Sequence, residues 1–163
     1  MRRAAAGLAL LLVLGAAVAD AARVRHATNH ADRLFGTARA DRISARGGAD
    51  RVFGRGGNDV IHGGKGNDRV VGNPGDDQVF GDDGNDRVNG GAGDDTLSGG
   101  AGNDRIYGGP GQDEISGGDG NDVIYARDGA DDTIDCGDGD DVAIVDNTED
   151  GVFDCEEIVA PQP

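Results

Sequence analysis

The stretch GGAGDDTLSGGAGNDRIYGGPGQDEISGGDGNDVIY, residues 90–125, contains four copies of one nine-residue unit. Each copy reads Gly-Gly-x-Gly-x-Asp, followed by an aliphatic residue two positions after the aspartate. A fixed short period is typical of solenoids, in which every repeat packs on its neighbours. The stretch therefore predicts a stacked architecture built from one repeated unit.

The period extends over most of the chain. The sixth position of the unit is aspartate at every ninth residue from Asp32 to Asp122. One extra residue is inserted within residues 126–130, after which Asp132 and Asp141 resume the spacing. The units before residue 63 keep the aspartate and the aliphatic residue but lose glycines, so we expect weak or absent sites at the N-terminal end.

Composition limits the possible functions. The 163 residues include 31 glycines and no tryptophan. The chain therefore has too few large apolar side chains for a conventional core. The formal net charge of −16 argues against nucleic acid and anionic membranes as partners and favours cations.

The N-terminus has the pattern of an export signal. Arg2 and Arg3 precede an apolar run over residues 4–18 and the small-residue segment 19–21. The alternatives are a buried helix or a membrane anchor, but the run is short for a membrane span. We therefore expect a signal peptide at 1–21, a secreted, extracellular mature protein and no membrane span after cleavage.

Two cysteines, Cys136 and Cys155, lie near the C-terminus. An even number of cysteines in an exported chain predicts a disulfide, which is favoured here over a metal or catalytic role. The expected organisation is a signal peptide, a leader with a degenerate first repeat, a repeat domain and a disulfide-stapled cap, at residues 1–21, 22–35, 36–144 and 145–163.

Five units contain the complete hexapeptide, from GGKGND at 63–68 to GGDGND at 117–122. They resemble the nonapeptide G-G-x-G-x-D-x-U-x of RTX, or haemolysin-type, calcium-binding proteins. The resemblance covers roughly residues 30–145. It implies an all-β fold, a parallel β-roll in which each hexapeptide turns the chain, each x-U-x forms a short strand and two nonapeptides complete one coil.

The same resemblance implies several Ca²⁺ ions between stacked turns. Calcium binds carboxylate and carbonyl oxygens, and glycine permits the backbone dihedrals that turn carbonyls towards an ion. Turns on one edge stack about 4.8 Å apart, so aspartates of successive turns can share an ion. The predicted carboxylate ligands are Asp50, Asp68, Asp86, Asp104 and Asp122 on one edge and Asp59, Asp77, Asp95, Asp113 and Asp132 on the other. The predicted carbonyl ligands belong to Gly63, Gly66, Gly90, Gly93, Gly99, Gly102, Gly108, Gly111, Gly117 and Gly120.

Without the ions, the stacked carboxylates repel one another and the glycine-rich turns are costly to order. We therefore expect the calcium-free chain to be largely disordered, so that binding is coupled to folding. Such a chain would stay loose during secretion and become ordered in the calcium-rich medium outside the cell.

The residues beside each aliphatic position should point outwards. On one sheet they form a ladder of arginines with an aromatic column beside it. The ladder either offsets the acidic edges or forms a docking face for an anionic glycan, a cell-surface polymer or a protein. The candidate partner residues are Arg51, Arg69, Arg87, Arg105, Phe53, Tyr107 and Tyr125.

The C-terminal segment departs from the repeat. Residues 146–157 nearly fit an EF-hand loop, but no flanking helices are expected, so a cap on the last coil is favoured. Phe153, Ile158 and Val159 are the predicted plugs of that cap.

No catalytic motif accompanies the three histidines, His26, His30 and His62. RTX repeats often accompany proteases, lipases or toxins, but here the repeats nearly fill the mature chain. Many RTX proteins also use an uncleaved C-terminal export signal, unlike this N-terminal one. We therefore expect a binding or structural protein and no enzyme.

Overall fold

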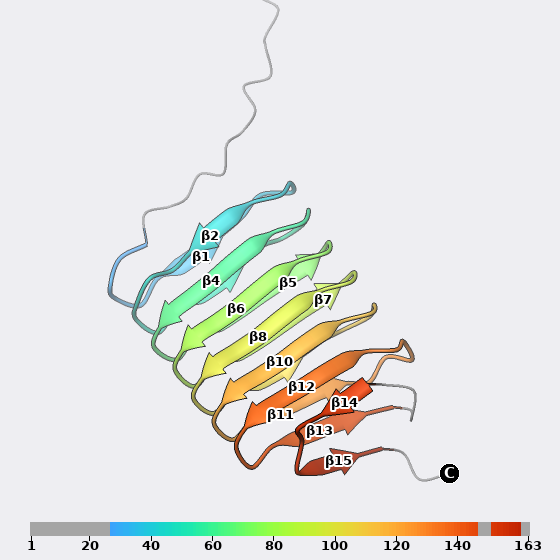
Figure 1. Ribbon diagram of the computed structural model, residues 1–163. Helices are drawn as coiled ribbons and strands as arrows, with labels where there is room; N and C mark the ends of the chain where they lie inside the picture. The colour runs from blue at the N-terminus through green and yellow to red at the C-terminus, as the bar shows by residue number, and fades with distance from the viewer. Residues whose placement is uncertain (1–26, 147–150, 161–163) are drawn as a thin grey trace, which may run out of the picture.

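The computed structural model describes residues 27–146 and 151–160, which form a solenoid of two parallel sheets (Figure 1). The predicted signal peptide lies outside these residues. The eight-stranded sheet consists of β1 (Arg33–Phe35), β3 (Arg51–Phe53), β5 (Arg69–Pro74), β7 (Arg87–Ala92), β9 (Arg105–Tyr107), β11 (Val123–Ala126), β13 (Val142–Val145) and β15 (Glu157–Val159). The seven-stranded sheet consists of β2 (Arg42–Ser44), β4 (Val60–Lys65), β6 (Gln78–Asp83), β8 (Thr96–Ala101), β10 (Glu114–Asp119), β12 (Thr133–Asp138) and β14 (Gly151–Phe153).

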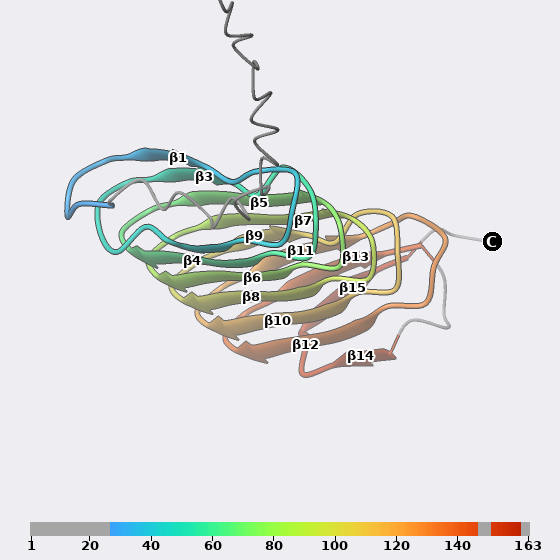
Figure 2. The ribbon, with the colours of Figure 1, turned by 90° about the horizontal axis from the view of Figure 1, so that it is seen from above.

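Successive strands alternate between the sheets, and each strand pairs in parallel with the strand two further along the chain (Figure 2). The partners are eighteen residues apart, as in Val52 with Val70, so two nonapeptides make one coil, as predicted. Partners on either side of the insertion are nineteen residues apart, as in Ile115 with Ile134. The extra residue lies in the turn between β11 and β12, where it leaves the inward-facing side of each strand unchanged.

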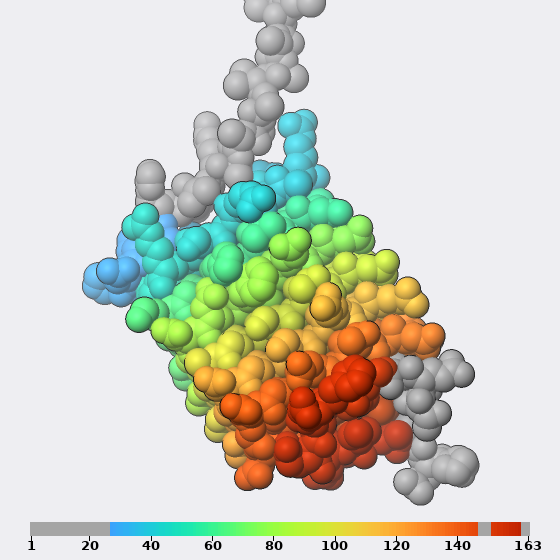
Figure 3. Space-filling view, in the orientation of Figure 1, coloured from blue at the N-terminus to red at the C-terminus, as the bar shows by residue number. Residues whose placement is uncertain are grey.

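The core is a single row of aliphatic side chains along each sheet. These side chains are at most 7% exposed, and they all belong to one cluster. They are Leu34, Ile43, Val52, Ile61, Val70, Val79, Val88, Leu97, Ile106, Ile115, Ile124 and Ile134. The coils follow one another as successive bands on the surface (Figure 3), so stability depends on contacts between adjacent coils.

Most strands in the middle of the solenoid are longer than the expected three residues. In β10 the pairing with β12 continues through the glycines, with Gly118 opposite Gly137 and Asp119 opposite Asp138. In such units the first three residues of the hexapeptide are strand and the chain turns at the fourth and fifth, whereas β9 ends at Tyr107, before its hexapeptide. The glycine-rich segment extends because parallel hydrogen bonds need only backbone groups.

The glycines serve two different needs. In the unit 63–68, Gly64 and Gly66 have φ of 104° and 121°, a region that side chains disfavour. Gly63 has no such φ, but a Cβ there would lie 2.7 Å from the Gly81 carbonyl oxygen and 2.8 Å from Asp68 Oδ2. The expectation that all glycines serve the turn dihedrals is therefore wrong for the first position, which is glycine because adjacent coils leave no room.

The disulfide between Cys136 and Cys155 is confirmed, with a Cα–Cα distance of 5.1 Å. The predicted plugs of the cap are wrong, since Phe153, Ile158 and Val159 are 58%, 53% and 37% exposed. Phe153 and Val159 occupy outward register positions, and Ile158 lies opposite Ala143 in the outermost strand, where no further coil of the described residues covers it. The residues that pack against the core are Val152, Cys155 and Ala160.

The EF-hand alternative is also not supported. The segment before residue 146 is β13, Gly151 begins β14 and Glu157 begins β15, which pairs with β13. The described residues on both sides of the loop are thus strands of the two sheets.

The spatial role of the first glycine gives a testable pair of variants. Gly54→Ala would place a Cβ against Asp59 Oδ2 and the Gly72 carbonyl, whereas the nearest atom to a Cβ at Gly56 is 3.7 Å away. Overpacking typically costs about 1–3 kcal/mol, so we expect Gly54→Ala to lower the free energy of unfolding by that order, measured with calcium present. Gly56→Ala is the control and should leave stability within about 0.5 kcal/mol; equal effects would contradict the role.

Candidate metal-binding edges

The predicted aspartates form two columns, one along each edge where the chain passes between the sheets. The first column contains Asp50, Asp68, Asp86, Asp104, Asp122 and Asp141, and the second contains Asp59, Asp77, Asp95, Asp113 and Asp132. All of them are at most 4% exposed. This placement was predicted from the nine-residue spacing together with the two-unit coil that the resemblance implies, because residues at one position of a coil repeat at each level of the stack.

One oxygen of each carboxylate joins adjacent coils. The backbone N–H of Asp86 donates to Asp104 Oδ1 over 2.7 Å, and that of Asp104 donates to Asp122 Oδ1 over 2.8 Å. The same bond recurs along both columns at 2.6–2.9 Å. Sequence reasoning missed this structural role, since it treated the aspartates as ligands that repel one another.

The other carboxylate oxygen is buried without a hydrogen-bond partner among the described residues. This holds for Asp50, Asp59, Asp68, Asp77, Asp86, Asp95, Asp104, Asp113, Asp122 and Asp141. A buried anionic oxygen without a partner is costly, and native proteins rarely leave one. Repeated at almost every level, it indicates that these edges are built for a bound cation.

The predicted glycines lie at two places around this oxygen. A Cβ on Gly99 would contact both Asp104 Oδ2 and the Gly117 carbonyl oxygen of the next coil, so both oxygens face the space left by the missing side chain. Gly63, Gly90, Gly108 and Gly117 have the equivalent position. The fourth-position glycines have positive φ and form the turn; they are Gly66, Gly93, Gly102, Gly111 and Gly120.

The donor set fits a hard cation. Within residues 27–146 and 151–160, no three acidic, histidine or cysteine side chains gather into a metal cluster. An ion at either edge would therefore combine one or two aspartates with backbone carbonyl oxygens. Oxygen-only ligation of this kind suits calcium rather than zinc or copper.

Residues at the fifth position of the hexapeptide form a second series of hydrogen bonds between coils. Here the donor N–H belongs to the following coil, whereas in the aspartate columns it belongs to the preceding coil. The N–H of Asn103 donates to Asn85 Oδ1 of the preceding coil over 3.0 Å, and that of Asn121 donates to Asn103 Oδ1 over 3.1 Å. Sequence reasoning missed these residues. The available signal was an amide or acid immediately before every aspartate from Asn58 onwards.

Burial raises the pKa of the column aspartates. The pKa values of Asp86, Asp95 and Asp104 rise to about 7, mainly through desolvation and further through neighbouring carboxylates, although a backbone N–H opposes the shift. The pKa values of Asp59, Asp113 and Asp122 rise to about 6, again chiefly by desolvation. The metal-free edges thus favour a positive charge, supplied by protons or by a cation.

The two edges differ in their surroundings. The first column lies in a groove of about 720 Å³ lined by the arginines of one sheet and by fifth-position asparagines, including Arg69, Asn85 and Arg87. The groove on the second edge, of about 450 Å³, is lined by acidic and neutral residues such as Asp94, Gln112 and Glu114.

The fold and its carboxylate columns define a parallel β-solenoid with oxygen-lined edges suited to divalent cations. The family model of the RTX calcium-binding nonapeptide repeat, which itself spans four copies of the repeat, matches overlapping segments of this chain. They are residues 26–61, 53–88, 62–97, 80–115, 98–132 and 107–143. These matches cover most of the chain, which therefore belongs to the RTX calcium-binding repeat family. A comparison with curated proteins found no match. In the part of the chain that the structure describes, no helix has the length and apolarity needed to cross a membrane.

The raised pKa values predict how the stability of the metal-free protein depends on pH. The reference pKa of an aspartate is 3.8, whereas Asp86, Asp95 and Asp104 in the roll titrate near 7. Between these values the folded state binds more protons, so the free energy of unfolding falls as the pH rises from about 4 to about 7. In circular dichroism of metal-stripped protein, we expect the β signal to grow as the pH is lowered from about 7 to about 4; a β signal that grows towards pH 7 would contradict this.

Proposed function

We propose that this chain is a secreted protein whose β-roll folds when calcium occupies the two edges. The observation that carries the proposal is the buried carboxylate oxygen without a partner, repeated from coil to coil. Membership of the RTX family supports calcium as the ion. The proposal assigns the protein a binding role and no catalytic activity.

Coupling between binding and folding follows from the balance of forces in one coil. Each nonapeptide buries one aliphatic side chain, while its glycines lose more backbone entropy on folding than other residues do. The carboxylates at successive levels also repel one another when ionised. A divalent cation removes the repulsion and contributes its binding energy only to the folded chain.

Secretion is supported by the N-terminal charge and hydropathy pattern and by the disulfide. Disulfides persist in oxidising compartments outside the cytosol. The medium outside the cell would supply the calcium that orders the roll.

Calcium titration monitored by circular dichroism tests the proposal. We expect little β signal in excess chelator, a cooperative gain of β signal with calcium, and a disulfide in the secreted protein. Asp95→Asn should weaken calcium binding, since the amide oxygen can still accept the Asp77 N–H but the charge is lost. Asp94→Asn is the matched control, because Asp94 is exposed and carries the same charge. A full β signal in chelator, or equal effects of the two variants, would contradict the proposal.

A second candidate function is adhesion to an anionic surface polymer through the eight-stranded sheet. The strand register aligns Arg33, Arg51, Arg69, Arg87 and Arg105 in one row. Among the described residues, none of these arginines forms an ion pair. Like charges directly opposite one another are destabilising, so a ligand that carries regularly spaced anionic groups would relieve the repulsion.

The aromatic column beside this row is interrupted. Phe35 stacks on Phe53 at 5.3 Å between ring centroids, and Tyr107 stacks on Tyr125 at 4.6 Å. Val71 lies between the two pairs in register, and the next strand has an asparagine there. The sheet thus offers two aromatic platforms suited to sugar rings, one at each end of the arginine row.

Neutralising the arginine row tests this second function. We expect replacement of Arg69, Arg87 and Arg105 by Gln to abolish retention on an immobilised sulfated or uronic polysaccharide while leaving calcium-induced folding intact. The control replaces Arg39, Arg42 and Arg46, which lie outside the row, with the same change in charge. Unchanged retention of the first variant, or equal loss in both, would remove this function.

A further inference from the structure

The first aspartate column ends on a residue that the repeat does not supply. The N–H of Asp122 donates to Asp141 Oδ1 over 2.7 Å, and the N–H of Asp141 donates in turn to Glu156 Oε2 over 2.8 Å. The backbone repeats the pattern, since Val142 N–H donates to the Asp122 carbonyl and Glu157 N–H to the Asp141 carbonyl, both over 3.0 Å. Glu156 therefore occupies the sixth position of the terminal coil, only fifteen residues after Asp141.

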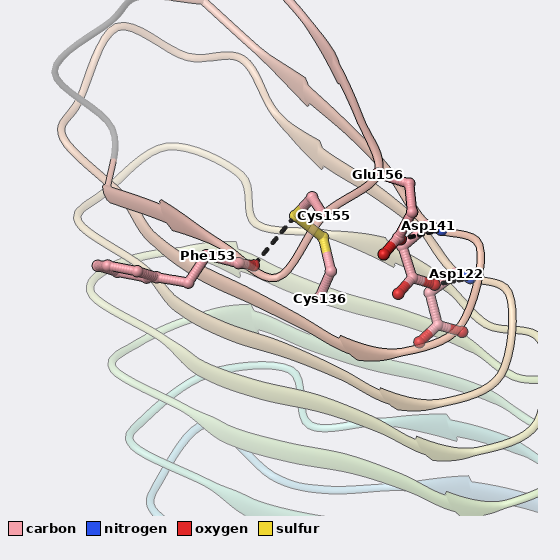
Figure 4. The surroundings of a disulfide bond; sticks show 6 residues. All are labelled: Asp122, Cys136, Asp141, Phe153, Cys155 and Glu156. Atoms are coloured by element: carbon pink, nitrogen blue, oxygen red, sulfur yellow. Dashed lines mark hydrogen bonds between the residues drawn. A yellow bond between two sulfur atoms is a disulfide. The ribbon is translucent and has the colours of Figure 1, made fainter.

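The disulfide holds Glu156 at this position. Cys155 directly precedes it and is bonded to Cys136, which is fully buried in the core at the end of the solenoid (Figure 4). Cys136 takes the first position of its unit, where complete repeats have glycine. Because one partner of the bond is fixed in the core, the terminal strand β15 is attached at the residue next to the carboxylate.

Negative charge is concentrated around Asp141. This residue is 1% exposed and its Oδ2 has no hydrogen-bond partner among the described residues. Burial is the main cause that raises the pKa of Asp141, and the carboxylates of Glu156, Asp140 and Asp138 raise it further. Asp122, Asp141 and Glu156 follow one another along the edge, with the Glu156 carboxylate directed towards Asp141 (Figure 4).

We propose that Asp141 and Glu156 form a terminal site for a divalent cation, completed by the disulfide that positions Glu156. The inference rests on the proposed calcium function and adds a ligand from outside the repeat. Its physical basis is the unpartnered buried oxygen of Asp141, beside a second carboxylate in the same column. A glutamate can serve here because, among the described residues, no further coil stacks on its longer side chain.

The ion count measured by native mass spectrometry, together with calcium titration calorimetry, tests the site. Glu156→Gln keeps an acceptor oxygen for the Asp141 N–H, so strand pairing should persist while the charge is lost. We expect this variant and the Cys136→Ala/Cys155→Ala variant each to bind one ion fewer than the wild type. Glu157→Gln is the matched control, since it removes the same charge one residue further on, and it should bind the full number.

Asp141→Asn provides a second variant in case Glu156→Gln fails to fold. It keeps the acceptor for the Asp122 N–H and should lose the same single ion. If Glu156→Gln and Asp141→Asn bind as many ions as the wild type with unchanged affinity, the terminal site is wrong although the repeat sites stand. If the wild type binds no calcium at all, the failure lies with the proposed function instead.

Discussion

The structure depends on a buried aspartate carboxylate whose two oxygens have different partners. One oxygen accepts a backbone N–H from the preceding coil, so the side chain replaces a strand hydrogen bond at the corner where the backbone turns away. The other oxygen is buried without a partner among the described residues and carries the charge that a cation can neutralise. Asparagine could satisfy the first need but not the second, because it is neutral. A glutamate at every level would carry an additional methylene into a column where adjacent coils are in close contact. The sixth position of the repeat therefore has to meet both requirements, and aspartate does.

Glycine makes this arrangement possible by its lack of a side chain as much as by its conformational freedom. At Gly99 the missing Cβ leaves the space into which both Asp104 Oδ2 and the Gly117 carbonyl point. At the second and fourth positions the backbone adopts positive φ, which Asn73 and Asp82 also adopt where the second glycine is lost. The first position accepts a narrower range of side chains than the second. Where it is not glycine, the residue is an alanine, or a cysteine or valine at the C-terminal end. The steric requirement is thus the stricter of the two, and the repeat departs from glycine mainly where the solenoid ends.

Periodicity predicted those features that every coil shares. The nine-residue spacing predicted a stacked fold with an aliphatic position in every unit from Leu34 to Ile134. The resemblance to the RTX nonapeptide added the eighteen-residue coil and, with it, the two aspartate columns. Periodicity could not predict the length of the strands, which depends on backbone pairing between coils and not on side-chain pattern. It also failed at the C-terminal end, where Ile158 lies opposite a core alanine but is covered by no further coil in the described part of the chain. Glu156 was missed because it follows Asp141 by fifteen residues and so breaks the spacing on which the prediction was based.

On the first edge, the aspartate column that is proposed to bind cations lies beside the arginine row of the eight-stranded sheet. On this edge the column aspartates from Asp50 to Asp104 are each followed by an arginine of the eight-stranded sheet, as in Asp68 with Arg69. In the metal-free protein the carboxylates partly offset the charge of that row. A divalent cation in the column would cancel this offset and leave the arginines facing a less negative edge, which increases their attraction for an anionic ligand at a range below the Debye length of about 8 Å. The second edge has no arginine row among its groove residues, so cation binding there has no such effect. If calcium orders the roll and the arginine row binds an anionic polymer, as proposed above, occupation of the first column would both order the sheet that presents the arginines and strengthen their attraction for the polymer.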